Sequence, residues 1–367
     1  MEKELKNSNI EYKEIEWYKD ALIIKNVKEN VNKIINKYKG YNYYFGVVKA
    51  DCYGHGYKKT VQAVIDGGCN YLAVATLEEA IKIRAIYTKI PILCLGVIDE
   101  EFLKICEENN ITITIGSLSY LKNLKLKDYN KIKVHLKINT GMNRLGISNG
   151  SELEEVVKIL KDNNIEIEGI YTHIYNALNE KHYEEQVEKF KNITKKIDIR
   201  NIKIVHISAS EATMNYPKLD FANGCRLGIV MYGFYGPKDL NLKSTFALKS
   251  EVIQINEIKK GETVGYNGTY TAEKNEKIAV VAIGYADGVI RKNKGRFVYI
   301  NDKKYEIVGN VCMDMMFVKV DDTVKTHDMV YVLKDKEHIE EVAKYLDTIP
   351  YEVICLIGKR VNRIYVK

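Results

Sequence analysis

The sequence predicts an α/β protein in which a closed (β/α)8 barrel of the TIM type precedes a mainly β domain. Between residues 43 and 233, short β-rich runs alternate with helix-length segments that mix polar and apolar residues. After about residue 245, β-rich runs follow one another through glycine turns without regular helices between them. These observations predict a barrel over residues 15–245 and a β domain over residues 246–367, with a strand in residues 1–14 as a candidate to join the β domain.

The barrel elements follow in order along the chain. Apolar residues at helical spacing, including Leu22, Val27 and Val31, predict a helix over residues 20–38. The strand candidates that come next are residues 43–50, 71–76, 90–96, 111–116, 132–138, 167–174, 202–208 and 225–233. An open, doubly wound sheet is the alternative, but no Gly-x-Gly-x-x-Gly turn follows any of these strands. We therefore expect the closed barrel.

The β domain is expected from a series of runs with alternating β pattern. They lie at residues 246–258, 263–272, 277–289, 296–302, 304–320 and 328–333. A helix over residues 338–349 and a last strand follow them. Because no low-complexity or Pro-rich linker separates the halves, we expect the two domains to pack directly on each other.

Composition favours a cytoplasmic protein that binds neither membranes nor nucleic acid. No run of about eighteen apolar residues occurs, and the first residues are charged without an apolar core. The net charge of +7 arises from 56 basic and 49 acidic residues that are interspersed rather than clustered. Seven scattered cysteines lack metal-ligand spacing, so we expect reduced core thiols and no metal site.

The first candidate site residue is Lys49, which ends an apolar strand and precedes a turn that contains Gly54 and Gly56. Barrel enzymes carry their chemistry at the carboxyl ends of the strands. Partial desolvation there lowers a lysine pKa and makes the amine a nucleophile toward an aldehyde. Taken alone, Lys49 is better explained as a surface lysine that ends a strand.

The stretch KADCYGHG, residues 49–56, resembles the cofactor-lysine signature KADAYGHG of the alanine racemase family. The resemblance implies that Lys49 carries pyridoxal 5′-phosphate (PLP) and that Tyr53 reaches the cofactor phosphate. Further motifs occur in the order of the family and extend the resemblance over nearly the whole chain: LKINTGMNRLG (136–146), YTHI (171–174), HISASEA (206–212), CRLGIVMYG (225–233), AIGYADG (282–288) and VGNVCMDMM (308–316).

The resemblance also implies roles for other barrel residues. Arg144 would bind the substrate carboxylate, for which a guanidinium fork is suited. Lys137 is a candidate for carbamylation, which would turn it into an anion that orients Arg144. His173 would stack against the pyridine ring. The remaining cofactor contacts, most of them to the phosphate, would come from Ser210, the backbone of Gly228 and Ile229, and Tyr351.

Arg226 matches the arginine that faces the pyridine nitrogen in the family. Most PLP enzymes place a carboxylate there, but arginine keeps its proton at any working pH. The ring nitrogen would therefore stay unprotonated. We expect this to favour return of the proton to Cα over transamination or decarboxylation.

Racemisation needs an acid and a base on opposite faces of Cα, so Lys49 requires a partner. By resemblance this partner is Tyr285, and the Met313 amide would contact the substrate carboxylate. Asp287 is interpreted as a turn former. In the family, the tyrosine-bearing β domain closes over the barrel of the other subunit, which implies a homodimer with shared active sites.

The resulting hypothesis is an alanine racemase that supplies D-alanine for peptidoglycan. A racemase of serine, lysine or broad specificity remains an alternative, because residues 175–180 and Asn310 depart from the family pattern. A non-catalytic PLP-binding protein would lack the Tyr285 motif, and a related decarboxylase would need an acidic residue in place of Arg226. A regulatory protein that has lost activity is a further alternative.

Overall fold

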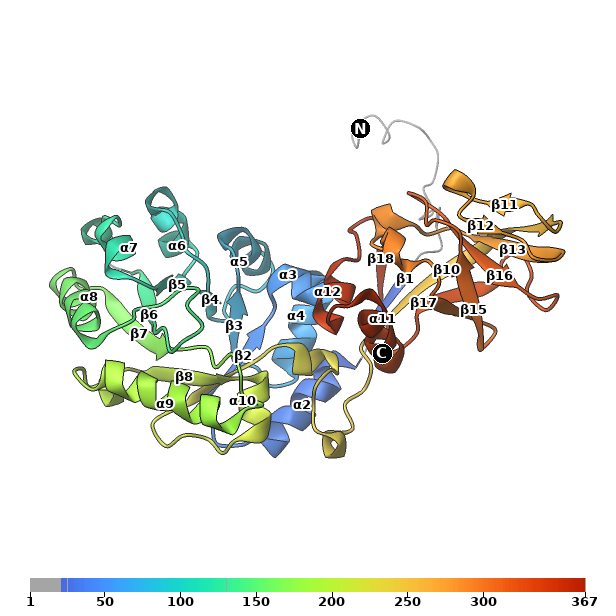
Figure 1. Cartoon of the computed structure of the whole chain (residues 1–367). Helices are drawn as coiled ribbons and strands as arrows, with labels where there is room; N and C mark the ends of the chain where they lie inside the picture. Colours follow the sequence, from blue (N-terminus) through green and yellow to red (C-terminus); the bar gives the residue numbers. More distant parts are fainter. Residues whose placement is uncertain (1–20, 25, 130, 367) are drawn as a thin grey trace.

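Eight parallel strands close into a barrel in the computed structural model of the chain, which describes residues 21–24, 26–129 and 131–366 (Figure 1). The barrel strands in order are β2 (Tyr43–Val47), β3 (Tyr71–Val74), β4 (Ile92–Cys94), β5 (Ile111–Ile115), β6 (Lys133–Lys137), β7 (Glu166–Tyr171), β8 (Ile204–Ala209) and β9 (Gly224–Leu227). Pairing of β2 with β9 closes the ring. The predicted barrel is confirmed, and each strand lies within or beside its predicted run.

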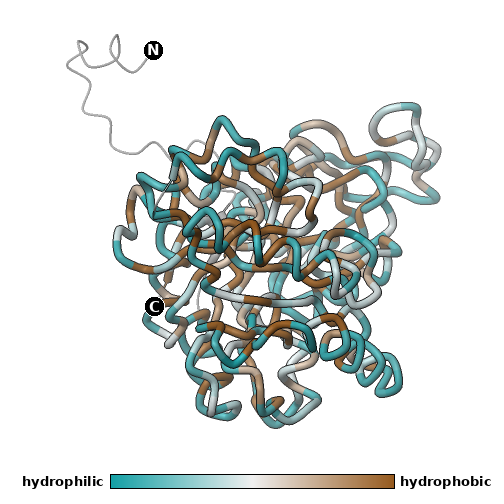
Figure 2. Tube along the Cα trace, turned by 90° about the vertical axis from the view of Figure 1, so that its left-hand side faces the viewer, coloured by the Kyte–Doolittle hydropathy of each residue, from teal (hydrophilic) through white to brown (hydrophobic). Residues whose placement is uncertain are grey.

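Helices connect the strands and cover the outside of the barrel. They are α2 (Val27–Lys37), α4 (Tyr57–Asp66), α5 (Leu77–Arg84), α6 (Leu103–Glu108), α7 (Leu118–Lys122), α8 (Gly150–Asp162), α9 (Glu180–Thr194) and α10 (Ser210–Asn215). Along the trace in Figure 2, hydrophobic and hydrophilic stretches alternate, as expected for helices with one buried face. No helix in the described part of the chain is long and apolar enough to span a membrane.

The interior of the barrel contains stacked aromatic rings as well as aliphatic side chains. The Phe45 ring stacks on those of Tyr71 and His206, with centroids 4.4 Å apart in both pairs. Tyr171 stacks on the opposite face of this group, 4.7 Å from His206. These rings fill the barrel interior below the carboxyl ends of its strands, so a ligand can bind only at those carboxyl ends.

The expected helix over residues 20–38 is wrong in its first part. Ala21–Ile24 forms a strand, β1, and only Val27–Lys37 is helical. β1 pairs antiparallel with β10 (Phe246–Ile258) and parallel with β18 (Asn362–Tyr365), so it joins the sheet of the second domain. Four residues are too few to show strand alternation, and their apolar side chains continued the helical period of the next segment. The candidate strand in residues 1–14 lies outside the described residues.

The second domain is mainly β, as predicted, and its strands pair antiparallel except for the parallel pair of β1 and β18. Its sheet order is β13-β16-β15-β14-β17-β10-β1-β18, and β10 also pairs with β13, so six strands form a ring of pairings. The remaining elements are β11 (Thr263–Val264), β12 (Tyr270–Thr271), β13 (Glu276–Val281), β14 (Phe297–Ile300), β15 (Lys303–Val308), β16 (Met316–Val320), β17 (Met329–Leu333), α11 (Lys336–Leu346) and α12 (Pro350–Cys355).

The two halves of the chain pack directly at the turn that follows the first barrel strand. The short segment α3 (Lys49–Tyr53) lies beside α12 (Figure 1). A Cβ atom at Gly54 would lie 2.3 Å from the carbonyl oxygen of Ile354, so only glycine fits this contact. The Arg363 guanidinium donates to the carbonyl of Gly54 at 3.3 Å, and the Tyr365 hydroxyl donates to that of His55 at 3.0 Å. The end of the chain thus supports the Lys49 turn.

Candidate active site

A cavity opens at the carboxyl ends of the barrel strands. Its volume is about 690 Å³, within the range of small-molecule sites. The predicted site residues that line it are Lys49, Tyr53, Lys137, Arg144, His173, Ser210, Arg226, Gly228, Ile229 and Tyr351. The strand order brings the barrel residues among them together, because parallel strands of a closed barrel end at one face, whereas Tyr351 reaches the cavity from α12. Tyr285 and Met313 do not line the cavity.

Lys49 projects from a turn with an unusual backbone. Ala50 to Tyr53 all have φ between 51° and 56°, which is a left-handed helical turn without glycine. Such a conformation costs about 1–2 kcal/mol per residue, so its surroundings must enforce it. The Glu79 carboxylate accepts a hydrogen bond from the Ala50 amide at 2.6 Å and another from the Ala75 amide at 2.8 Å. This turn lets both Lys49 and Tyr53 face the cavity. The sequence predicted a turn here but not its handedness.

Small polar groups form a cradle at one side of the cavity. The Ser210 hydroxyl accepts the Gly228 amide at 2.9 Å. A Cβ atom at Gly228 would lie 3.0 Å from the Tyr53 hydroxyl oxygen and 3.6 Å from that of Ser210. The missing side chain therefore leaves room for an anion to approach the backbone between two hydroxyl groups.

Positive charge dominates the rest of the lining. Burial lowers the pKa of Lys49, and the positive charge of Arg144 adds to this effect. Burial and the Arg144 charge lower the pKa of Lys137 to about 8. Burial, followed by the Arg226 charge, lowers the pKa of His173 to about 3, so His173 is neutral at pH 7. Such a site binds anions and holds part of its lysine as free amine.

Arg226 is buried and held by acceptors from three directions. Its guanidinium donates to Nδ1 of His206 at 2.9 Å, to the carbonyl of Thr172 at 2.6 Å and to that of Ile207 at 3.2 Å. Burial lowers the pKa of Arg226 to about 10, so it still carries its proton at neutral pH. A cationic donor with fixed direction therefore faces the cavity.

Tyr285 and Met313 lie together in the second domain, away from the cavity of the same chain. Their side chains are 41% and 53% exposed. The Tyr285 amide donates to the carbonyl of Cys312 at 2.9 Å, and that of Ala286 donates to the carbonyl of Met313 at 3.0 Å. The Asp287 carboxylate accepts a hydrogen bond from the Gly284 amide at 2.8 Å, which is the contact expected of a residue that stabilises a turn. One chain thus presents two separate parts of the predicted site.

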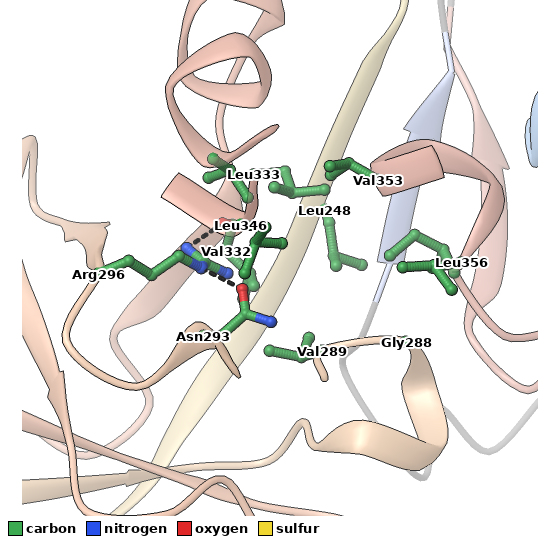
Figure 3. A pocket seen from close by; sticks show the side chains of 12 residues that line it. Leu248, Gly288, Val289, Asn293, Arg296, Val332, Leu333, Leu346, Val353 and Leu356 are labelled. Atoms are coloured by element: carbon green, nitrogen blue, oxygen red, sulfur yellow. Dashed lines mark hydrogen bonds between the residues drawn. The ribbon is translucent and has the colours of Figure 1, made fainter. Parts of the chain in front are cut away.

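Arg360 holds these two loops together. Its guanidinium pairs with the buried Asp287 after Tyr285 and, at 2.6 Å, with Asp314 after Met313. A small cavity nearby, lined by Val289, Asn293 and Arg296, measures about 10 Å³ (Figure 3). This is the space of one water molecule at most, so it is not a second ligand site.

The sequence patterns did not indicate a role in the site for two residues that lie near it, Glu79 and His206. Glu79 belongs to a Thr76-x-x-Glu79 capping box, which is a recognisable helix-start signal, although nothing in that signal indicates its contact with Ala50. His206 opens the HISASEA motif but was not assigned a role, and its contact with Arg226 depends on strand pairing. In the described part of the chain, no three His, Cys, Asp or Glu side chains are grouped to hold a metal ion.

Comparisons with known proteins agree with this architecture. The family model of the alanine racemase N-terminal domain matches residues 24–236, and that of the C-terminal domain matches residues 245–365. Alanine racemase 1 of Bacillus subtilis is 36% identical over 355 residues, covering 93% of this chain and 91% of its own length. Alanine racemase of Clostridium kluyveri is 36% identical over 368 residues, covering 95% and 94%.

Solved structures give the same result. Alanine racemase of Clostridium difficile 630 superposes with a TM-score of 0.89 at 34% identity, covering 95% of both chains. The alanine racemase structure from E. faecalis has a TM-score of 0.89 at 31% identity, covering 95% of this chain and 99% of its own. The chain therefore belongs to the alanine racemase family, whose members depend on PLP.

Proposed function

We propose that this protein is a PLP-dependent alanine racemase that interconverts L- and D-alanine and so supplies D-alanine for peptidoglycan. The observation that carries the proposal is the single cavity in which the Lys49 amine, the Gly228 cradle and the Arg226 guanidinium meet. The residues fit the cofactor: hydroxyl groups of Tyr53 and Ser210 flank a cradle that a Cβ atom would fill, as a phosphate requires. When bound, PLP withdraws electrons from the amino acid and so acidifies its Cα–H bond.

Lys49 would hold the cofactor and move the proton on one face of Cα. Its lowered pKa favours the free amine that this role needs. Arg144 would bind the substrate carboxylate, and neutral His173 would pack against the cofactor ring. Ser210 with the Gly228 and Ile229 backbone, Tyr53 and Tyr351 would surround the phosphate. Arg226 would donate to the ring nitrogen and, because it keeps its proton, would disfavour transamination and decarboxylation.

Tyr285 would serve as the acid or base on the other face, and Met313 would contact the carboxylate. Because neither residue lines the cavity of its own chain, we propose that a second copy supplies both in a homodimer. Their exposure supports this, since a residue that completes a partner's site must lie at the surface of its own chain. We also propose a domain boundary at residues 245/246, between β9 and β10, with β1 assigned to the β domain.

The decisive experiment is Cα–H exchange in D₂O, followed by chiral analysis, with L-alanine, L-serine and L-lysine. We expect alanine enantiomers to equilibrate with the parent protein and not with Tyr285→Phe, which keeps the ring but removes the proton-transfer group. Exchange confined to serine or lysine would reassign the substrate, the alternative that the departures at 175–180 and Asn310 leave. Exchange of none of them by a protein that holds PLP would favour the non-catalytic binding protein.

Lys137 is expected to react with CO₂. Carbamylation needs the neutral amine, and a pKa of about 8 leaves about a tenth of Lys137 neutral at pH 7. Raising the pH from 7 to 9 should therefore increase the carbamate signal in ¹³C NMR after addition of ¹³C-bicarbonate. Lys137→Met should abolish the signal, whereas Lys133→Met, on the same strand, should leave it unchanged. An identical signal in Lys137→Met would contradict the assignment.

A further inference from the structure

We propose that Glu168 and His135 are positioning residues for Arg226, acting through a chain of buried side chains that crosses the barrel interior. The inference rests on the proposed function in one respect, namely that Arg226 faces the cofactor ring. The series of contacts starts at Arg226 on β9 and passes through His206 on β8 and His135 on β6 to Glu168 on β7. These four strands are neighbours in the barrel. The series connects the active-site end of the barrel with the opposite end.

Two hydrogen-bond contacts join Arg226 to His135, and an electrostatic contact joins the buried Nε2 of His135, which has no hydrogen-bond partner among the described residues, to Glu168. Arg226 lies 2.9 Å from Nδ1 of His206, and Nε2 of His206 lies 2.8 Å from Nδ1 of His135. Nε2 of His135 then lies 3.5 Å from Oε2 of Glu168, a longer and mainly electrostatic contact. All four residues are at most 4% exposed. Water therefore has no direct access to these links.

The chemistry of Arg226 fixes the direction of every link. Guanidinium only donates hydrogen bonds, so Nδ1 of His206 must accept and its proton must sit on Nε2. That proton points at His135, whose Nδ1 must accept in turn and whose proton must also sit on Nε2, facing Glu168. Burial lowers the pKa of both histidines, which favours their neutral forms and so one tautomer each.

Glu168 is held as an anion at the far end. Burial acts to raise the pKa of Glu168, but contacts with His135, Lys203 and Tyr71 outweigh it and hold this pKa well below its usual range. The Tyr71 hydroxyl donates to Oε2 at 2.7 Å, and the Lys203 ammonium lies 2.9 Å from Oε1. The Glu168 carboxylate thus lies at one end of this series of contacts and the Arg226 guanidinium at the other. Their opposite charges polarise the two neutral imidazole rings between them in one direction.

The His206 ring has no room to reorient. Phe45 and Tyr171 stack on it with centroids 4.4 Å and 4.7 Å away and interplanar angles of 13° and 14°. The His135 ring packs closely over Gly169, where a Cβ atom would lie 2.5 Å from it, and the Phe45 and Tyr71 rings lie 6.1 Å and 5.9 Å away. Because the rings are fixed, a change at Glu168 acts on Arg226 through proton position rather than through movement of the barrel.

The test begins with ¹⁵N NMR of the imidazole groups in the holoenzyme, which reports tautomers without any substrate. We expect His206 and His135 to be Nε2–H tautomers in the parent protein. Glu168→Gln should change the His135 signals and shift those of His206, while Glu166→Gln, an exposed carboxylate on the same strand, should change neither. Parent tautomers with Nδ1–H on either ring would overturn the proposal, whatever reaction the protein catalyses.

The second readout is the ratio of pyruvate release to racemisation. In this side reaction alanine leaves as pyruvate, its amino group stays on the cofactor and water supplies the keto oxygen. Glu168→Gln should raise this ratio about tenfold, because it removes the anion that positions Arg226 through the two histidines. KM for alanine should change less than about twofold, because the substrate contacts are untouched. His135→Asn, which keeps an acceptor for His206 but ends the contact with Glu168, should act in the same direction if Glu168→Gln folds poorly. An unchanged ratio in both variants would overturn the proposal.

Discussion

Mixing Lys49→Ala and Tyr285→Phe subunits should restore about a quarter of the parental racemase activity, although each variant alone should lose at least about 10³-fold in kcat. Random exchange makes about half of the dimers mixed, and each mixed dimer has one site with both residues intact. The expectation follows from the position of Tyr285, which is exposed and absent from the cavity of its own chain. The measurement is chiral analysis after the two variants have been refolded together.

The control for this experiment combines both substitutions in one chain. Mixed with Tyr285→Phe, the double variant leaves no site with both groups, so activity should stay at the level of the single variants. Recovery of racemase activity in this control would contradict a site shared between two copies. Absence of recovery in the first mixture, when subunit exchange has been demonstrated, would contradict it as well.

Gly54→Ala is expected to lower the free energy of unfolding by about 2–4 kcal/mol and to weaken PLP retention. The added Cβ would lie 2.3 Å from the Ile354 carbonyl oxygen, and φ at Gly54 is +80°, which alanine rarely adopts. Either α12 or the Lys49 turn must therefore move. Chemical denaturation measures the first effect, and cofactor absorbance after dialysis measures the second.

Gly261→Ala is a matched control, because Gly261 has a similar φ of +91° but no atom within 4 Å of the new Cβ. It should cost only the backbone strain, about 1 kcal/mol, and leave PLP retention unchanged. Equal losses in the two variants would show that strain alone, rather than contact between the halves, determines the effect.

The barrel could be predicted because its signals are local. Each strand is a short apolar run, and the rule that parallel strands end at one face brought Lys49, Arg144 and Arg226 together without any distance. β1 could not be predicted, since a four-residue strand depends on its partners β10 and β18 for its identity. Its apolar residues fitted the helical period of the segment that follows.

Other features depend on contacts that no sequence pattern carries. The left-handed turn at Ala50–Tyr53 consists of residues that ordinarily avoid positive φ. The hydrogen bond from Ala50 to Glu79, the packing of α12 and the contacts from Arg363 and Tyr365 support it. The contact between His206 and His135 arises from barrel closure, which places residues 71 positions apart within 2.8 Å. Pattern reasoning predicted residues that line the cavity, but not the contacts that support them.

The support of the Lys49 turn by β18 bears on the order in which parts of the site form during synthesis. Arg363 and Tyr365 contact the carbonyl groups of Gly54 and His55, more than 300 positions earlier in the chain. Synthesis proceeds from the N-terminus, so the barrel strands emerge from the ribosome well before these two side chains. The contacts that support the Lys49 turn from Arg363 and Tyr365 can therefore form only after this late segment has been synthesised.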